Sequence, residues 1–364
     1  MNYSLSAVSG LTALGLAVAL AVGLASGVGE DPSNTAEAPT AQVPTRTIDL
    51  DELPSGDEPV IPWLADGTIR TPDADLPVNN GLDIRKFTAI GPSEVLALDD
   101  TTGDGTANRL VHIDEQGTTE IAAGPVATFA VSLDRNSVAW SEWAGDSGRL
   151  VHAEADTGDV LAQTPIDAQA YVTGFSQHTV IVERPYPHAA QIWDPTLTGP
   201  EQLTDIHDTK GATATDPKRG LTSVVTKHVD DPETGAPLAC SSVIDTHANA
   251  ELWSTCQAIP ISFSPDGRYI WARDTRTDDA LPSSMFLLDA ETGQKAMHVE
   301  VEGVTQRVSW EPGGSIVFDA WTGGNMALVR CSTAADGDCE LATRPEPSEP
   351  PALKSLPYLL AHQS

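Results

Sequence analysis

Carboxylates at alternating loop positions are the residues in this chain that most directly suggest a metal-binding site. Asp100 and Asp104 lie in such a loop, Asp100-Thr101-Thr102-Gly103-Asp104-Gly105. Ca²⁺ prefers oxygen ligands arranged in this way, usually completed by a bidentate Glu at the twelfth position, where this chain has Val111. An acidic hairpin loop therefore explains the segment with fewer assumptions. Asp100 and Asp104 are the candidate metal ligands should Ca²⁺ bind, and no other cofactor is expected.

A second segment contains a serine that could act as a nucleophile. Gly145-Asp146-Ser147-Gly148 resembles the nucleophile loop of trypsin-like serine proteases, in which the serine needs a histidine base held by a carboxylate. Gly, Asp and Ser are also the residues that a tight turn prefers. No counterpart of that family's histidine loop is present, and the nine histidines form no zinc-binding spacing. The sequence therefore predicts a turn, no catalytic residues and a protein that is not an enzyme.

The four cysteines are spaced as two local pairs. Cys240 and Cys256 are equidistant from the turn-like His247-Ala248-Asn249, and Cys331 and Cys339 are equidistant from Ala335. Partners across a hairpin have this symmetry, whereas a four-thiolate metal site needs closer pairs. We predict the disulfides Cys240–Cys256 and Cys331–Cys339, which are typical of exported proteins.

The N-terminal region predicts export. Residues 5–28 are uncharged and apolar enough to cross a bilayer, so 1–29 is expected to form one hydrophobic helix, either a cleaved signal peptide or a retained membrane anchor. Residues 30–59 are acidic and rich in Pro and Thr, which predicts a disordered linker. The rest of the chain is expected to be secreted, or held outside the cytoplasm with membrane contact through the N-terminal segment alone.

The charge excludes one class of partner. The formal net charge is -32, from 52 acidic and 20 basic side chains. Such a chain repels phosphate backbones, so nucleic acid is not an expected partner. A protein or a small extracellular ligand is expected instead.

Two signals recur in phase along residues 86–343. The first is a turn followed by an apolar strand, and successive strand starts are 43, 42, 44, 46 and 46 residues apart, at Val95, Val138, Val180, Val224, Ile270 and Ile316. The second is an apolar triplet that runs into an acidic turn, as in Val111-His112-Ile113-Asp114. Each unit is therefore expected to contain four short antiparallel strands, and such units bury both faces by packing around an axis.

One unit resembles a known repeat. Phe263-Ser264-Pro265-Asp266-Gly267-Arg268-Tyr269 is similar to the signature of TolB-like and WD40-like β-propeller repeats, and Trp193-Asp194 resembles the end of a WD40 strand. The resemblance implies an all-β propeller of four-stranded blades over residues 60–364. Six blades are clear, and 61–78 together with 356–360 could form a seventh.

The resemblance leaves function open, since propellers serve as scaffolds, binding surfaces and sometimes enzymes. We expect an extracytoplasmic binding or scaffold module; the alternatives are an exported lyase or hydrolase and a membrane-tethered sensor or regulatory subunit. The loops joining second and third strands carry Trp143, Tyr186 and Trp321, which are predicted as exposed binding residues. The channel-facing residues are expected to be small and mostly neutral, with no convergence of titratable groups: Ala89, Ala130, Thr173, Thr213, Ser262 and Ser309.

Overall fold

The computed structural model describes residues 43–362, except for 79–80, 104–106, 146, 168, 185–188, 207–208, 277–281, 335–336 and 349–355. The predicted N-terminal helix, 1–29, lies outside the described residues, as does the first part of the predicted linker. Within the described ranges, no helix is long and apolar enough to cross a membrane.

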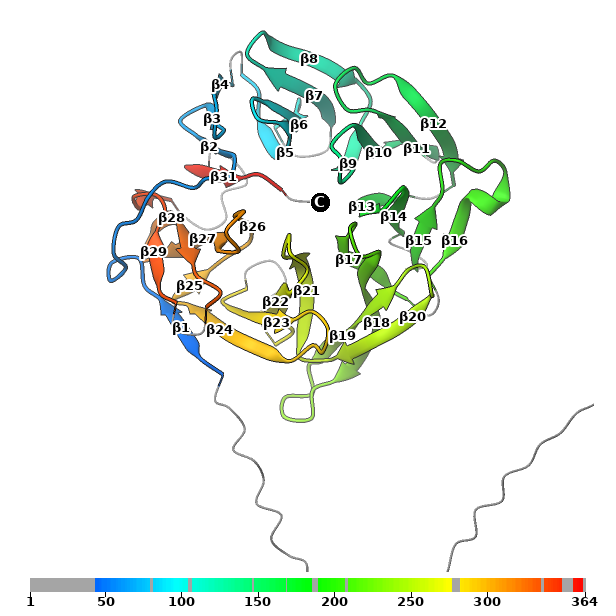
Figure 1. The fold of residues 1–364 in the computed structure, drawn as a ribbon. Coiled ribbons are helices and arrows are strands. Elements are labelled where there is room, and N and C mark those ends of the chain that lie inside the picture. The colour runs from blue at the N-terminus through cyan, green and yellow to red at the C-terminus, as the bar shows by residue number, and fades with distance from the viewer. Residues whose placement is uncertain are drawn as a thin grey trace, which may run out of the picture. The chain divides into compact units, whose positions relative to one another are not determined.

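Seven small β-sheets surround a central axis, so the fold is a seven-bladed β-propeller (Figure 1). Five blades are formed by consecutive runs of four antiparallel strands, each beginning with the innermost strand. Blade 1 contains β5 (Ile84–Gly91), β6 (Glu94–Asp100), β7 (Asn108–Asp114) and β8 (Gly117–Ala122). Blade 2 contains β9 (Val126–Val131), β10 (Ser137–Ala144), β11 (Ser147–Glu154) and β12 (Val160–Ile166).

The next three blades follow the same order. Blade 3 contains β13 (Tyr171–Ser176), β14 (Thr179–Arg184), β15 (Ala189–Trp193) and β16 (Leu203–Asp205), with the short 3-10 helix η1 (Pro200–Gln202) before β16. Blade 4 contains β17 (Gly211–Asp216), β18 (Leu221–Asp230), β19 (Pro237–Asp245) and β20 (Ala250–Thr255). Blade 5 contains β21 (Ala258–Phe263), β22 (Tyr269–Asp274), β23 (Ser284–Asp289) and β24 (Lys295–Val301). The first recurring signal marks the second strand of each blade, and the second marks the third.

Hydrogen bonds in the turn after the innermost strand explain why degenerate repeats keep the same shape. In blade 5 the Ser264 hydroxyl donates to Asp266 (2.7 Å) and accepts the backbone N–H of Tyr269 (2.9 Å). In blade 2 Ser132 makes the same two contacts, with Asp134 (2.6 Å) and with the N–H of Ser137 (3.1 Å). A serine and an aspartate two residues apart therefore fix this turn in both blades, although the surrounding residues differ.

Blade 6 has a broken innermost strand. Its strands are β25 (Gly303–Val304), β26 (Val308–Trp310), β27 (Ile316–Thr322), β28 (Asn325–Cys331), β29 (Cys339–Leu341) and β30 (Glu346–Pro347). β25 and β26 both pair with β27. The buried Asp319 carboxylate accepts the backbone N–H groups of Gln306 (2.7 Å) and Arg307 (2.8 Å), which lie in the gap between the two pieces. These bonds satisfy donors that the interrupted ladder leaves without a strand partner.

Blade 7 is assembled from both ends of the described chain, which answers the open question of six or seven blades. Its strands, from the axis outward, are β31 (Tyr358–Leu360), β2 (Trp63–Ala65), β3 (Thr68–Arg70) and β4 (Asp75–Pro77). β31 and β2 are antiparallel, with Leu359 opposite Leu64. Beyond β31, the backbone N–H of His362 donates to the carbonyl of Phe87 on β5 (2.7 Å). The C-terminal strand therefore closes the ring and joins it to blade 1.

The predicted linker proves too long. β1 (Thr45–Ile48) pairs in parallel with β24 at the outer edge of blade 5. Ile48 is fully buried and Leu50 is 2% exposed, and both belong to the core between blades 5 and 6. The prediction of a disordered linker through residue 59 is therefore wrong from β1 onward. An edge strand offers unpaired backbone groups that a short β-branched segment can satisfy, and composition alone does not reveal such a partner.

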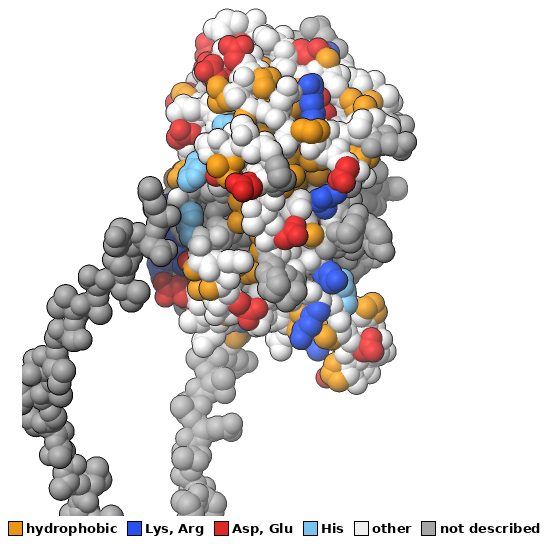
Figure 2. Space-filling view, turned by 90° about the vertical axis from the view of Figure 1, so that its right-hand side faces the viewer, with side chains coloured by type: hydrophobic (Ala, Val, Ile, Leu, Met, Phe, Trp, Pro, Cys, Tyr) orange, Lys and Arg blue, Asp and Glu red, His pale blue; other side chains and the backbone are white. Residues whose placement is uncertain are grey.

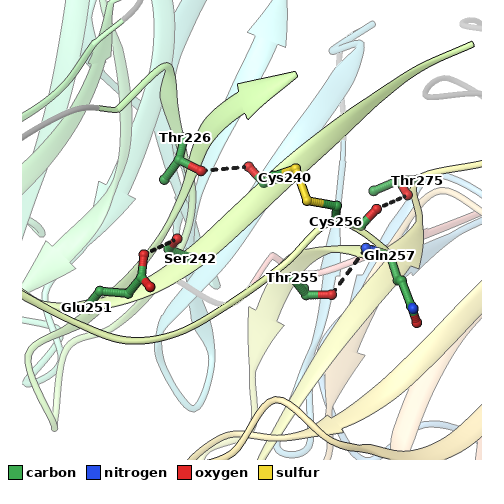
Figure 3. The surroundings of a disulfide bond; sticks show 8 residues. All are labelled: Thr226, Cys240, Ser242, Glu251, Thr255, Cys256, Gln257 and Thr275. Atoms are coloured by element: carbon green, nitrogen blue, oxygen red, sulfur yellow. Dashed lines mark hydrogen bonds between the residues drawn. A yellow bond between two sulfur atoms is a disulfide. The ribbon is translucent and has the colours of Figure 1, made fainter. Parts of the chain in front are cut away.

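Both predicted disulfides are present within single blades. Cys331 on β28 lies directly opposite Cys339 on β29. Cys240 and Cys256 lie one position beyond the paired residues Ser241 and Thr255. Around this second bridge, the carbonyls of Cys240 and Cys256 accept hydroxyl groups of Thr226 and Thr275 (Figure 3).

The disulfides should contribute to stability without defining the fold. Replacing Cys240 and Cys256 by Ser should lower the free energy of unfolding by about 2–4 kcal/mol, because the bridge restricts the unfolded chain. Urea unfolding measures this loss. Peptide mapping of the non-reduced protein should recover the two local bridges, and a bridge between the two pairs would contradict the blade boundaries.

Closure of the ring can be tested at Leu359. This side chain is 4% exposed in the core between blades 7 and 1. Leu359→Ala should cost about 2–5 kcal/mol because it leaves a cavity. The control is Leu252→Ala on β20, where the leucine is 47% exposed and the same change should cost under about 0.5 kcal/mol. Equal unfolding midpoints for the two variants would show that β31 does not hold the ring closed.

Candidate functional site: the axial channel

The predicted aromatic site does not form as expected. Trp321 lies in β27, is 2% exposed and donates its indole N–H to the Ser348 hydroxyl (3.3 Å). β27 continues to Thr322 and pairs Trp321 with Met326, so the prediction that Trp321 is exposed in a loop is wrong. Trp143 is half-buried at the end of β10, against Gly148 and the core of blades 2 and 3. Tyr186 lies outside the described residues.

The candidate calcium residue Asp100 uses both carboxylate oxygens within the protein. One oxygen accepts the guanidinium of Arg85 (2.8 Å), and the other accepts the backbone N–H groups of Thr102 (3.0 Å) and Gly103 (2.8 Å). Asp104 lies outside the described residues. In the part of the chain that the structure describes, no group of three or more His, Cys, Asp or Glu is placed to hold a metal ion. Asp100 therefore has a structural role in this turn.

The suspected nucleophile, Ser147, lies in a hairpin turn. Ala144 at the end of β10 pairs with Ser147 at the start of β11, so two residues form the connection. Gly145 has a φ of 66°, a left-handed conformation that glycine adopts without strain. Asp146 lies outside the described residues. The geometry agrees with a turn, as the sequence indicated.

A large cavity lies inside the ring of innermost strands. This wide chamber has a volume of about 730 Å³ and reaches the turns that join first and second strands, at Pro92, Arg135, Lys218, Pro265 and Pro312. A narrow chamber of about 460 Å³ lies toward Arg273 and Pro282, near the opposite ends of the strands. Five residues line both chambers and are called the neck here: Lys86, Ile261, Ser262, Ala361 and His362. The two chambers together form an axial channel.

β-Bulges in the innermost strands decide which side chains face the wide chamber. The register of β13, β17 and β21 shifts at Thr173, Thr213 and Ile261, and all three residues line the chamber. A bulge inserts one residue without a partner and redirects its side chain. Ala89, Thr173, Thr213 and Ser262 line the channel as predicted. Ala130 and Ser309 were predicted there too, but they are fully buried and line neither chamber.

Two titratable groups meet at the neck, contrary to the prediction that none converge. Lys86 on β5 donates its amine to the carbonyl of Phe129 (2.9 Å) and lies 5.1 Å from the centre of that ring. The carbonyl of His362 accepts the Thr88 hydroxyl (3.0 Å), which fixes the chain beside β5. Burial lowers the pKa of Lys86 to about 7. Burial, together with the positive charge of Lys86, lowers the pKa of His362 well below its usual value.

The channel differs in charge from the rest of the chain. Acidic, basic and hydrophobic side chains are interspersed on the side of the molecule shown in Figure 2. Among the described residues, six Lys and Arg side chains and two Asp and Glu side chains line the two chambers, although the full sequence has 20 basic and 52 acidic residues. The basic residues are Arg85, Lys86, Arg135, Lys218, Arg273 and Arg307, and the acidic ones are Glu183 and Asp216.

Most arginines of the narrow chamber are neutralised by neighbours. Arg85 pairs with Asp83 and Asp100 at 2.8 Å each, and Arg307 pairs with Asp319 at 3.4 Å. Within the described chain, no carboxylate forms an ion pair with Lys86. The sequence does contain one signal for this residue that the sequence analysis did not use. Arg85-Lys86 places two adjacent cations on a predicted innermost strand, in a chain with few lysines.

Comparison with known proteins supports the fold. No family model matches the sequence, and no curated protein is detectably similar to it. The β-propeller domain of the Trilobed protease from Pyrococcus furiosus is similar in structure, with a TM-score of 0.53 and 9% identity over 76% of this chain and 86% of that one. The propeller of Dos1 has a TM-score of 0.49 and 13% identity over 79% of each chain.

TolB from Acinetobacter baumannii is also similar, with a TM-score of 0.47 and 14% identity over 71% of this chain. The match spans 65% of the TolB chain, which is less than two thirds of it. The seven sheets of the ring, together with the similarity to the propeller of the Trilobed protease, confirm the predicted propeller fold. The chain is a seven-bladed β-propeller with four-stranded blades and an axial channel.

The titration of Lys86 should be visible in the stability of the protein. Its folded-state pKa is about 7, whereas an unfolded lysine titrates near about 10.4. Unfolding therefore takes up a proton between these values, and Lys86 lowers stability most below pH about 7. We expect Lys86→Met to raise the free energy of unfolding near neutral pH, with a gain that shrinks as the pH approaches about 10.

Urea unfolding at several pH values measures this effect. Lys227→Met on β18 is the control, because that lysine is exposed and its replacement should change stability by less than about 0.5 kcal/mol. A gain from Lys86→Met that does not vary with pH would contradict the assignment.

Proposed function

We propose that this protein is an exported binding module that captures its ligand in the wide chamber of the axial channel. The observation that carries the proposal is the chamber itself, a cavity of about 730 Å³ inside a rigid ring of seven blades. Cavities of about 300–1,000 Å³ with apolar walls and a few polar groups are typical of small-ligand sites.

The chamber wall has this composition. Val172, Ile261 and Trp310 contribute apolar surface, while Thr128 and Ser262 contribute hydroxyl groups. The Thr128 hydroxyl accepts the backbone N–H of Val172 (2.7 Å) and donates to the Val172 carbonyl (3.1 Å). These two hydrogen bonds hold blades 2 and 3 together at the chamber wall. A wall fixed in this way is organised before the ligand arrives, which lowers the entropic cost of binding.

Two features support a location outside the cytoplasm. The described chain contains two disulfides and no free cysteine. Structural disulfides persist in oxidising compartments and are rare in the cytosol. The apolar segment 5–28 of the sequence is in keeping with export, either as a cleaved signal or as an anchor.

The proposal predicts that filling the chamber abolishes capture. Thr173→Trp places an indole on a bulged, chamber-facing position, whereas Val160→Trp adds the same group on the outer strand β12, where the valine is 56% exposed. Tagged full-length protein would be incubated with the exported fraction of its own cells, and the molecules it retains would be measured by mass spectrometry. Thr173→Trp should lose what the native protein and Val160→Trp retain.

A different result would place the ligand site outside the channel. If Thr173→Trp captures ligand normally while Trp143→Ala does not, the loops between second and third strands bind the ligand and the channel does not. The unfolding midpoints of all variants need to match, so that a loss of capture cannot be caused by unfolding of the variant.

A further inference from the structure

Lys86 is a lysine at the centre of the channel, and no carboxylate in the described chain forms an ion pair with it. Its amine contacts the Phe129 carbonyl and the face of that ring, and it lines both chambers. The neighbouring arginines Arg85 and Arg307 are already paired with aspartates. A charge in a half-buried site is costly when no opposite charge is near it, so a ligand that supplies a negative charge here gains a contact that the protein alone does not make.

A second donor lies at the same neck. The hydroxyl oxygen of Ser262 accepts the indole N–H of Trp310 (3.0 Å), which leaves the Ser262 hydroxyl hydrogen free to be donated. Lys86 and Ser262 both line the two chambers, and Ile261 and Val172 supply apolar surface on the side of the wide chamber. The neck therefore offers one positive charge and one neutral donor at the end of a partly apolar cavity.

We propose that the neck binds the carboxylate of an amphipathic monocarboxylic acid, with Lys86 and Ser262 as donors and the apolar body of the ligand in the wide chamber. This inference rests on the proposed function, since it names the ligand class of the same chamber. A doubly charged phosphate would need a second unpaired cation, and Arg85 and Arg307 are not available to supply one.

Binding should be coupled to proton uptake. Because the pKa of Lys86 is about 7, its amine is mostly neutral at pH 8, and a bound carboxylate favours the charged form. The other charged or titratable groups that line the two chambers are His362, Arg85, Arg135, Glu183, Asp216, Lys218, Arg273 and Arg307. Of these, His362 is neutral at this pH, because burial and the charge of Lys86 lower its pKa well below the usual value.

The experiment is calorimetric titration of the full chain with octanoate at pH 8, in two buffers that differ in ionisation enthalpy. We expect binding with uptake of more than half a proton per octanoate. Octanamide, which has the same apolar body without the charge, should bind about tenfold more weakly or worse, as should octyl phosphate. Lys86→Met should weaken octanoate binding about tenfold or more and abolish the proton uptake, whereas Lys218→Met at the chamber rim should keep both.

The outcomes separate this inference from the proposed function. Octanamide or octyl phosphate binding as tightly as octanoate, or octanoate binding unchanged in Lys86→Met, would overturn the carboxylate site. If Thr173→Trp still blocks capture from the exported fraction in that case, the channel remains the binding site for another ligand class. If octanoate binds native protein and Thr173→Trp alike, the carboxylate does not enter the channel and the inference fails. Absence of octanoate binding would overturn it as well.

Discussion

The pairing of β31 with β2 is the constraint on which the rest of the structure depends. Each blade buries its faces against its two neighbours, so a ring is stable only when the last gap is closed. Here the closing blade takes its innermost strand from the C-terminal end of the chain and its other strands from the N-terminal side. The same segment then continues to His362, whose backbone bonds to Phe87 and Thr88 of blade 1. The segment that closes the ring therefore also forms the neck of the channel.

Much of the fold could be predicted because turn chemistry recurs along the chain. Ser132 with Asp134 and Ser264 with Asp266 fix equivalent turns, and this local signal survives where the rest of the repeat has diverged. The first recurring signal marked the second strand of each repeat, and the second signal marked the third strand. β1 could not be predicted, since its four residues acquire order from the edge of a blade about 250 residues away. Trp321 was misplaced because β27 extends to Thr322, and element boundaries are the least certain part of a sequence-based assignment.

The site could be predicted only in part, because it depends on backbone irregularities that sequence does not encode locally. Small residues of the innermost strands, such as Thr173 and Thr213, were expected in the channel and lie there. Their orientation results from bulges, whose positions are set by pairing with the next strand. Lys86 was missed because the contacts that define it come from distant parts of the chain: Phe129 of blade 2 and His362 of the C-terminal segment.

Hydrogen exchange of the C-terminal segment tests this account most directly. The ring, the neck and the proposed ligand site all require that residues 358–362 are ordered at the axis. Exchange followed by mass spectrometry should show that the backbone amides of this segment are protected to the same extent as those of β27, which is fully buried in blade 6. Exchange of this segment at the rate of an unstructured chain, with β27 protected, would contradict closure by β31 and the channel built on it.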